Sequence, residues 1–146
     1  MSLDPNNPIV RLCVEGLACE TNHRFEDALS LYMQAWNQSS DDFERCISAH
    51  YVARQQKSVQ DALRWNLESL TRANAVKNGS IREFYPSLYL NVGRSSEEAG
   101  DAEQARKYYS LAQDTFGELP ESAYGDMVRR GVERGLLRIA NASINL

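Results

Sequence analysis

One spacing pattern occurs in two stretches of this chain of 146 residues and decides the fold: GLACETNHRFEDALSLYMQA at residues 16–35 and GRSSEEAGDAEQARKYYSLA at residues 93–112. In both copies a glycine, an alanine, a tyrosine and an alanine are separated by 12, 4 and 3 residues. The positions are Gly16, Ala28, Tyr32 and Ala35, and then Gly93, Ala105, Tyr109 and Ala112. Spacings of three and four residues place side chains on one face of an α-helix. Each copy therefore predicts a helix, a turn and a second helix.

A weaker copy lies between these two. Residues 61–70 align with residues 27–36 at an offset of 34. Helical pairs that recur at this period are typical of the tetratricopeptide repeat, and the chain resembles that family over about residues 9–117, in particular its small stand-alone bacterial members. The resemblance implies helix–turn–helix repeats that stack as a right-handed superhelix, and a protein that binds other proteins without catalysis.

The predicted fold is all-α: three such repeats followed by a C-terminal capping helix. Residues 1–8 are expected to be a flexible lead-in, and residues 9–142 a single domain. The repeats are placed at about residues 9–38, 42–79 and 82–117, and the capping helix at about 121–140. A terminal helix of this kind closes the open end of a repeat stack.

The period of the repeat fails once. Ala28 and Ala62 are 34 residues apart, but Ala62 and Ala105 are 43 apart, and we place the additional residues around 71–85. We interpret them as a longer fourth helix and a longer turn. Either Ser80 and Glu83 start the fifth helix early and Pro86 kinks it, or Pro86 lies in its first turn.

Small residues are expected where the helices of a pair cross, and large ones fill the space beside them. Ala62 takes the small position of the middle repeat by spacing. At an offset of 34, His50 and Asn66 take the places of the glycines and tyrosines. We favour a slip of one residue, which puts Ala49 and Trp65 there, over a looser crossing.

Composition restricts the function. The net charge of −4 argues against binding to nucleic acid, which needs a basic surface. No apolar run approaches the ~18 residues of a membrane helix, and the first 20 residues lack the features of a secretory signal. We therefore expect a cytoplasmic protein with three reduced cysteines, Cys13, Cys19 and Cys46.

The resemblance implies that the first helices of the pairs line a concave groove for a peptide or a partner helix. Carried over by position, the ligand-binding residues are Leu17, Ile47, Tyr51, Arg54, Leu90 and Arg94. Apolar side chains beside arginine suit the anchoring of a short segment. The alternative is that the apolar residues are ordinary core and that the arginines pair with Glu20, Glu97 or Glu98.

One known ligand class is not expected. Family members that hold the C-terminal carboxylate of chaperones use lysine and asparagine on the first repeat. Cys13 and Leu17 stand at the corresponding positions here, and neither side chain donates to a carboxylate as those do. Arg94 alone does not rebuild that site.

Cys46 and His50 lie four residues apart and share a helix face, which raises a thiol or metal site as a minor possibility. The spacing is far less specific than paired CxxC motifs, and no nucleotide-binding or metalloprotease motif is present. We predict no catalytic residues, no cofactor and no metal.

The last predicted helix carries two further patterns. Gly131 and Gly135 form a small-residue patch, interpreted as packing within the chain or, alternatively, as a homodimer contact. Arg130, Arg134 and Arg138 recur every four residues and are expected to form a solvated stripe. Self-association through this helix is thus the alternative function.

Overall fold

The computed structural model describes residues 3–144, and the side chains of residues 3–142. The described part of the chain is all-helical and contains no strand. It divides into two compact units, Met1–Gly79 and Ser80–Leu146, which are described separately. The division falls in the segment where the repeat period fails. The all-α prediction is confirmed.

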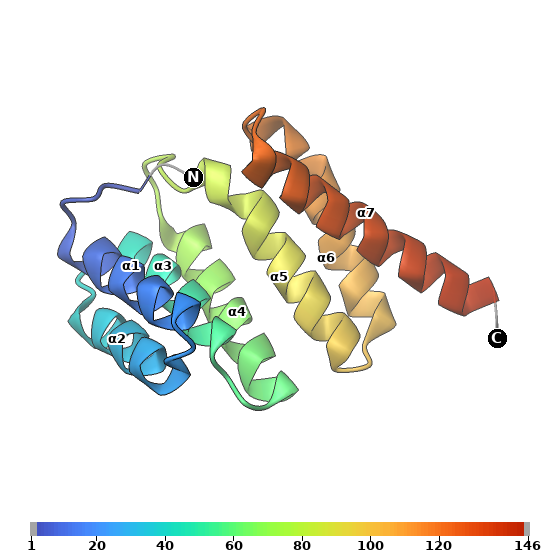
Figure 1. Cartoon of the computed structure of the whole chain (residues 1–146). Helices are drawn as coiled ribbons and strands as arrows, with labels where there is room; N and C mark the ends of the chain where they lie inside the picture. The colour runs from blue at the N-terminus through green and yellow to red at the C-terminus, as the bar shows by residue number, and fades with distance from the viewer. Residues whose placement is uncertain (1–2, 145–146) are drawn as a thin grey trace. The chain divides into compact units, whose positions relative to one another are not determined.

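The first unit contains four helices: α1 (Pro8–Thr21), α2 (Phe25–Gln38), α3 (Asp42–Arg54) and α4 (Val59–Ala75) (Figure 1). α1 packs against α2, and α3 packs against α4. α3 also contacts α2 and α1, so the two hairpins form one body. α1 begins one residue before the predicted start of the first repeat, α2 ends at the predicted end of that repeat, and α3 begins where the second repeat was predicted to begin. α4 ends at Ala75 and is therefore slightly shorter than its sequence pattern suggested.

Side chains cap three of the four helices of this unit, namely α1, α3 and α4. Asn7 Oδ1 accepts hydrogen bonds from the backbone N–H groups of Ile9 and Val10, at 2.8 and 3.2 Å. Ser58 Oγ accepts one from the N–H of Asp61 at 3.0 Å and so caps the start of α4. Each bond satisfies a donor that the first helical turn leaves without a partner.

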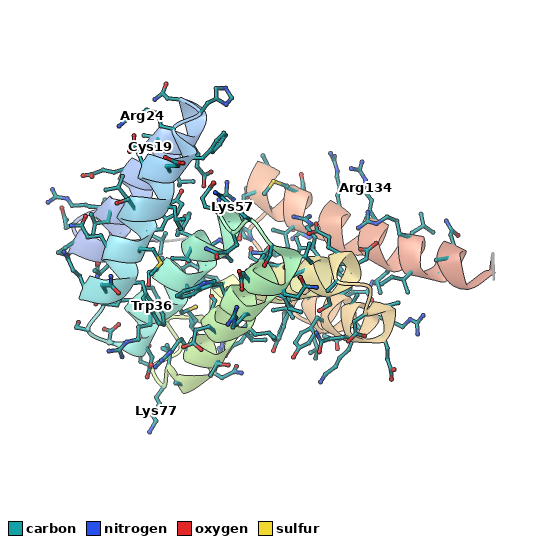
Figure 2. All side chains as sticks on the ribbon, turned by 90° about the horizontal axis from the view of Figure 1, so that it is seen from below. Cys19, Arg24, Trp36, Lys57, Lys77 and Arg134 are labelled. Carbon is teal, nitrogen blue, oxygen red and sulfur yellow. The ribbon has the colours of Figure 1, made fainter. Side chains whose placement is uncertain are left out.

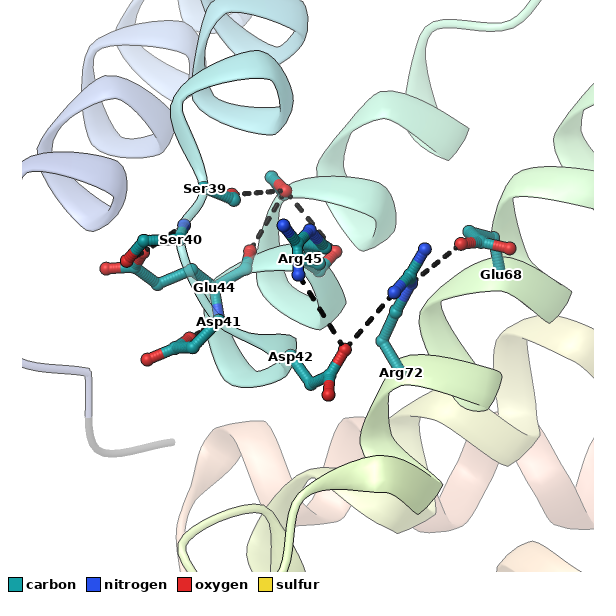
Figure 3. A network of polar contacts seen from close by, with 9 residues as sticks. Ser39, Ser40, Asp41, Asp42, Glu44, Arg45, Glu68 and Arg72 are labelled. Atoms are coloured by element: carbon teal, nitrogen blue, oxygen red, sulfur yellow. Dashed lines mark hydrogen bonds and ion pairs between the residues drawn. The ribbon is translucent and has the colours of Figure 1, made fainter.

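A polar network fastens the start of α3 to α4 (Figure 3). Arg72 on α4 donates from Nε to Glu68 at 2.8 Å and from Nη1 to Asp42 Oδ1 at 3.2 Å. Asp42 Oδ1 also lies 4.0 Å from Arg45 Nη1. At the centre of the same helix pair, Ser69 Oγ donates to the carbonyl oxygen of Cys46 at 2.8 Å.

The middle repeat follows neither register throughout. Ala49 is fully buried on α3, as the slipped register requires. On α4, however, Asn66 and Ser69 are buried, while Trp65 is only partly buried and meets Trp36 edge to face, with 5.1 Å between ring centroids. Trp65, the large residue predicted to fill the crossing of α3 and α4, thus packs beside that crossing. Ala62, expected where the two helices approach most closely, is only partly buried.

The second unit contains the 3₁₀ turn η1 (Arg82–Phe84), α5 (Tyr85–Glu98), α6 (Ala102–Asp114), the 3₁₀ turn η2 (Phe116–Glu118) and α7 (Ala123–Ile144). Pro86 lies in the first turn of α5. The alternative with a proline kink is therefore wrong, because the chain forms a separate 3₁₀ turn before α5 begins. Gly100 joins α5 to α6 with φ +85°, a conformation that favours glycine.

α7 packs on both helices of the α5–α6 pair. A hydrophobic cluster of this unit is shared by all three helices and the residue after η2, and its buried members are Leu90, Ala105, Tyr109, Ala112, Leu119, Val128, Val132 and Ile139. α7 starts two residues later than predicted and extends to Ile144. None of the helices in residues 3–144 combines the length and the apolar character needed to cross a membrane.

Candidate functional site

Glu20 is the centre of a polar cluster in the first unit. Its Oε1 accepts hydrogen bonds from the hydroxyl of Tyr32 and the amide of Gln55, each at 2.8 Å. Arg54 donates hydrogen bonds to both carboxylate oxygens of Glu20, from Nε to Oε1 at 3.2 Å and from Nη2 to Oε2 at 2.7 Å. A two-point contact of this kind is among the stronger ion pairs that side chains form.

Burial by itself would raise the pKa of Glu20, but the hydrogen bonds from Arg54, Gln55 and Tyr32 outweigh it and hold the pKa below its ordinary value. Burial also raises the pKa of Tyr32, and the neighbouring carboxylate adds to the effect. Glu20 is therefore charged and Tyr32 neutral at neutral pH, so the tyrosine donates.

The second unit repeats this cluster with different helices. Tyr109 donates to Glu97 Oε1 at 2.7 Å, and Arg138 of α7 donates from Nε and Nη2 to the two carboxylate oxygens, each at 2.9 Å. The hydrogen bonds from Arg138 are the main cause of the lowered pKa of Glu97. α7 thus contributes to the α5–α6 pair an arginine that binds the glutamate of the pair at two points, as α3 does for the α1–α2 pair.

Sequence reasoning missed the two glutamates as members of the repeated motif. Glu20 follows Gly16 by four residues and precedes Tyr32 by 12, and Glu97 stands at the same distances from Gly93 and Tyr109. These shared spacings were the available signal.

The six residues predicted to bind a ligand differ in accessibility. Ile47, Tyr51 and Leu90 are buried, and Leu90 belongs to the core of its unit. Tyr51 stacks against Tyr32 with 5.4 Å between ring centroids. Leu17 is partly buried. In this structure the three buried side chains serve packing, so ligand contact through them stays a prediction.

The two predicted arginines are exposed but differ in their partners. Arg54 is held by Glu20, as the ion-pair alternative proposed, and its side chain remains 47% exposed. Arg94 does not pair with Glu97, whose oxygens are taken by Arg138. In the described part of the chain, no carboxylate lies within ion-pair distance of Arg94.

Arg94 instead borders a hollow of about 400 Å³ on the second unit. α5 contributes Arg94, and α7 contributes every other lining residue: Ala123, Asp126, Met127, Arg130, Gly131 and Arg134. Arg130 and Arg134 were expected to belong to a solvated stripe with Arg138. The three arginines have different surroundings in the structure: Arg138 pairs with Glu97, whereas Arg130 and Arg134 border the hollow.

The glycines of α7 pack against other helices of the same unit. A Cβ atom on residue 131 would lie 3.1 Å from Leu90 Cδ2 and 3.2 Å from Arg94 Nη2. A Cβ on residue 135 would lie 2.6 Å from Tyr109 Cε2. Both glycines therefore permit close packing within the chain, the first of the two interpretations of this patch.

The Cys46–His50 pair has the character of core. Burial raises the pKa of Cys46 to about 11 and that of Cys13 to about 12, so both thiols are protonated and poorly nucleophilic at neutral pH. Burial and the charge of Arg54 lower the pKa of His50 to about 4. Within residues 3–142, no three His, Cys, Asp or Glu side chains are grouped closely enough to hold a metal ion.

In comparisons with known proteins, no family model matches the chain. No curated protein matches it in sequence either.

Proposed function

We propose that this protein is a non-catalytic protein–protein interaction module, an adaptor or scaffold that takes up a peptide or a helix of its partner. The three helical pairs would stack as a tetratricopeptide-like superhelix that α7 caps, and the first helices α1, α3 and α5 would carry the contacts. The resemblance of the repeats supports this architecture, as does the recurrence of the Gly–Tyr–Glu packing in both units.

The observation that carries the proposal is the exposed guanidinium of Arg94, which has no carboxylate within ion-pair distance in residues 3–142 and lies at the edge of a hollow that Met127 also lines. Arginine beside an apolar side chain is a frequent anchor in protein interfaces. Arg54, with two of its N–H donors engaged by Glu20, keeps others for a ligand. The fold places both arginines on first helices of their pairs.

The test is capture of partners from a lysate of the source organism by the wild type and by Arg54→Ala/Arg94→Ala. Arg24→Ala/Arg106→Ala is the matched control, because both of its positions are exposed and neither lies on a first helix. We expect a partner that the wild type and the control retain and the first variant loses. Equal retention by all three proteins would contradict the proposal.

Self-association remains the alternative function. Met127 and Leu137, both on α7, are 62% and 61% exposed, so this helix offers apolar side chains that a second copy of the chain could cover. Sedimentation over a range of concentrations, with Leu137→Gln for comparison, tests it. A mass that rises with concentration only in the wild type would favour a dimer, and a constant monomer mass would reject it.

A further inference from the structure

We propose that the hollow of the second unit binds an acidic protein segment, with neighbouring Asp or Glu side chains held by Arg94, Arg130 and Arg134. This inference rests on the proposed function and specifies the chemistry of the partner.

The three arginines at the hollow, Arg94, Arg130 and Arg134, carry positive charge that no ion pair in the described part of the chain balances. Among residues 3–142, no carboxylate lies within ion-pair distance of any of these three arginines. The other two arginines of α7 are paired: Arg129 with Glu121 and Asp126, and Arg138 with Glu97. The charge of Arg94 helps to lower the pKa of Glu97, but Glu97 is already paired with Arg138. A chain with a net charge of −4 thus places around one hollow three guanidinium groups that have no ion-pair partner within residues 3–142.

The one carboxylate in the described lining does not neutralise the hollow. Asp126 lies 3.4 Å from Arg129 Nη1, so a neighbour outside the lining already engages its charge. An incoming anion therefore meets three cations and a carboxylate that is partly compensated.

The layout of the charges favours several carboxylates over one compact anion. Arg130 and Arg134 are one helical turn apart on α7, and Arg94 approaches from α5. Figure 2 shows Arg134 pointing away from the α7 ribbon. Acidic side chains spaced along an extended segment can reach charges spaced along a helix better than a single phosphate can. Each guanidinium can also bind one carboxylate at two points.

Gly131 lines the hollow beside these arginines, and no side chain at this position fills the space between them. Because it has no side chain, Arg94 Nη2 lies only 3.2 Å from where a Cβ atom would stand. Ala123, Met127 and Gly131 follow one another at intervals of four residues, so they form an apolar strip beside the charges. This strip suits an apolar residue next to the acidic ones in the partner segment.

The probe for the test is a fluorescein-labelled, C-terminally amidated peptide, Glu-Asp-Glu-Leu-Asp-Glu-Asp. Its neutral counterpart, Gln-Asn-Gln-Leu-Asn-Gln-Asn, is the matched control ligand. We expect fluorescence polarisation to show binding of the acidic peptide only, weakened severalfold when NaCl rises from roughly 50 to roughly 300 mM. The triple variant Arg94→Gln/Arg130→Gln/Arg134→Gln should lose about tenfold or more in affinity. Arg106→Gln, an exposed position on α6, should lose none.

A second readout does not depend on variants. Methyl NMR of the wild type with labelled methionine should show a shift of the Met127 resonance on addition of the acidic peptide, while the Met33 resonance on α2 stays in place. Absence of binding, equal binding of the neutral peptide, or an equal loss with Arg106→Gln would overturn the inference. Tighter, arginine-dependent binding of a single-stranded oligonucleotide would overturn it in favour of nucleic acid.

Failure of this inference is distinguishable from failure of the proposed function. If lysate capture depends on Arg54 and Arg94 but the acidic peptide leaves Met127 unmoved, the inference falls and the interaction module stands. If the peptide binds in the hollow but capture is independent of both arginines, the inference stands and the groove-based function falls.

Discussion

Gly16 and Tyr32 pack so closely that a Cβ atom on residue 16 would overlap the tyrosine ring, with Cδ1 at 2.8 Å and Cε1 still closer. Gly93 and Tyr109 repeat this relationship, with a Cβ on residue 93 at 2.8 Å from Cδ1. In each pair, the glycine lets the ring lie across the first helix and deliver its hydroxyl to the glutamate one turn later.

Gly16→Ala should destabilise the first unit by about 1–3 kcal/mol, because the buried ring of Tyr32 has no room to move aside. This cost exceeds the ~1 kcal/mol that alanine gains over glycine in a helix. Urea unfolding followed by tryptophan fluorescence is the measurement, since both tryptophans, Trp36 and Trp65, belong to this unit. Glu15→Ala, at an exposed position on the same helix α1, should be nearly neutral, and equal stability of the two variants would contradict the packing argument.

The glycines of α7 should differ in their tolerance of alanine. Gly135→Ala meets the fully buried ring of Tyr109 and should cost about 1–3 kcal/mol, whereas Gly131→Ala meets only side-chain ends at 3.1–3.3 Å and should cost less than about 1 kcal/mol. Thermal unfolding by circular dichroism checks the order. The reverse order would show that α7 packs in a different register.

Acid should weaken both glutamate clusters. The pKa values of Glu20 and Glu97 are lowered in the folded protein, so the unfolded chain takes up their protons first as the pH falls. Their contribution to stability is complete above the ordinary pKa of 4.5 and is lost as the pH falls through the lower folded values. Glu20→Gln/Glu97→Gln should be less stable at neutral pH and lose less stability between pH 5 and 3, as measured by urea unfolding at each pH. An unchanged pH profile would exclude the two carboxylates as its source.

His50 should make the stability of the fold depend on pH over a higher range than the two glutamates do. Its pKa falls from an ordinary 6.5 to about 4 in the folded protein, because burial and the charge of Arg54 disfavour the imidazolium. Stability is therefore complete above about pH 6.5 and declines toward pH 4, by about 3 kcal/mol in all. His50→Gln should remove this decline and leave the drop below pH 4.5. NMR titration of the imidazole provides the direct check, and a pKa near 6.5 would contradict the assignment.

Local spacing was sufficient to predict the helices. The glycine, alanine and tyrosine positions predicted the α1–α2 and α5–α6 pairs because packing partners within a hairpin lie at fixed distances along the chain. Pro86 left two alternatives open, since a proline is compatible with the first turn of a helix as well as with a kink. Only the 3₁₀ turn before α5 separates them.

The candidate site was only partly predictable, because it depends on which helices pack together. Arg94 was identified from its position in the repeat, but Arg130 and Arg134 join it only because α7 packs on α5. The same packing brings Arg138 to Glu97, 41 residues away in sequence. Leu90 and Ile47 show the converse, since an apolar residue on a first helix satisfies a groove pattern and a core pattern equally well.

The most direct test of the central claim is site-specific photo-crosslinking in lysate of the source organism, with benzoylphenylalanine in place of Met127. Arg106, which is also exposed but lies on α6 outside the lining of the hollow, is the control position. The account predicts a discrete crosslinked protein from position 127, absent from position 106 and competed away by the acidic peptide. Crosslinks of equal pattern and yield from both positions would contradict a binding site at the hollow.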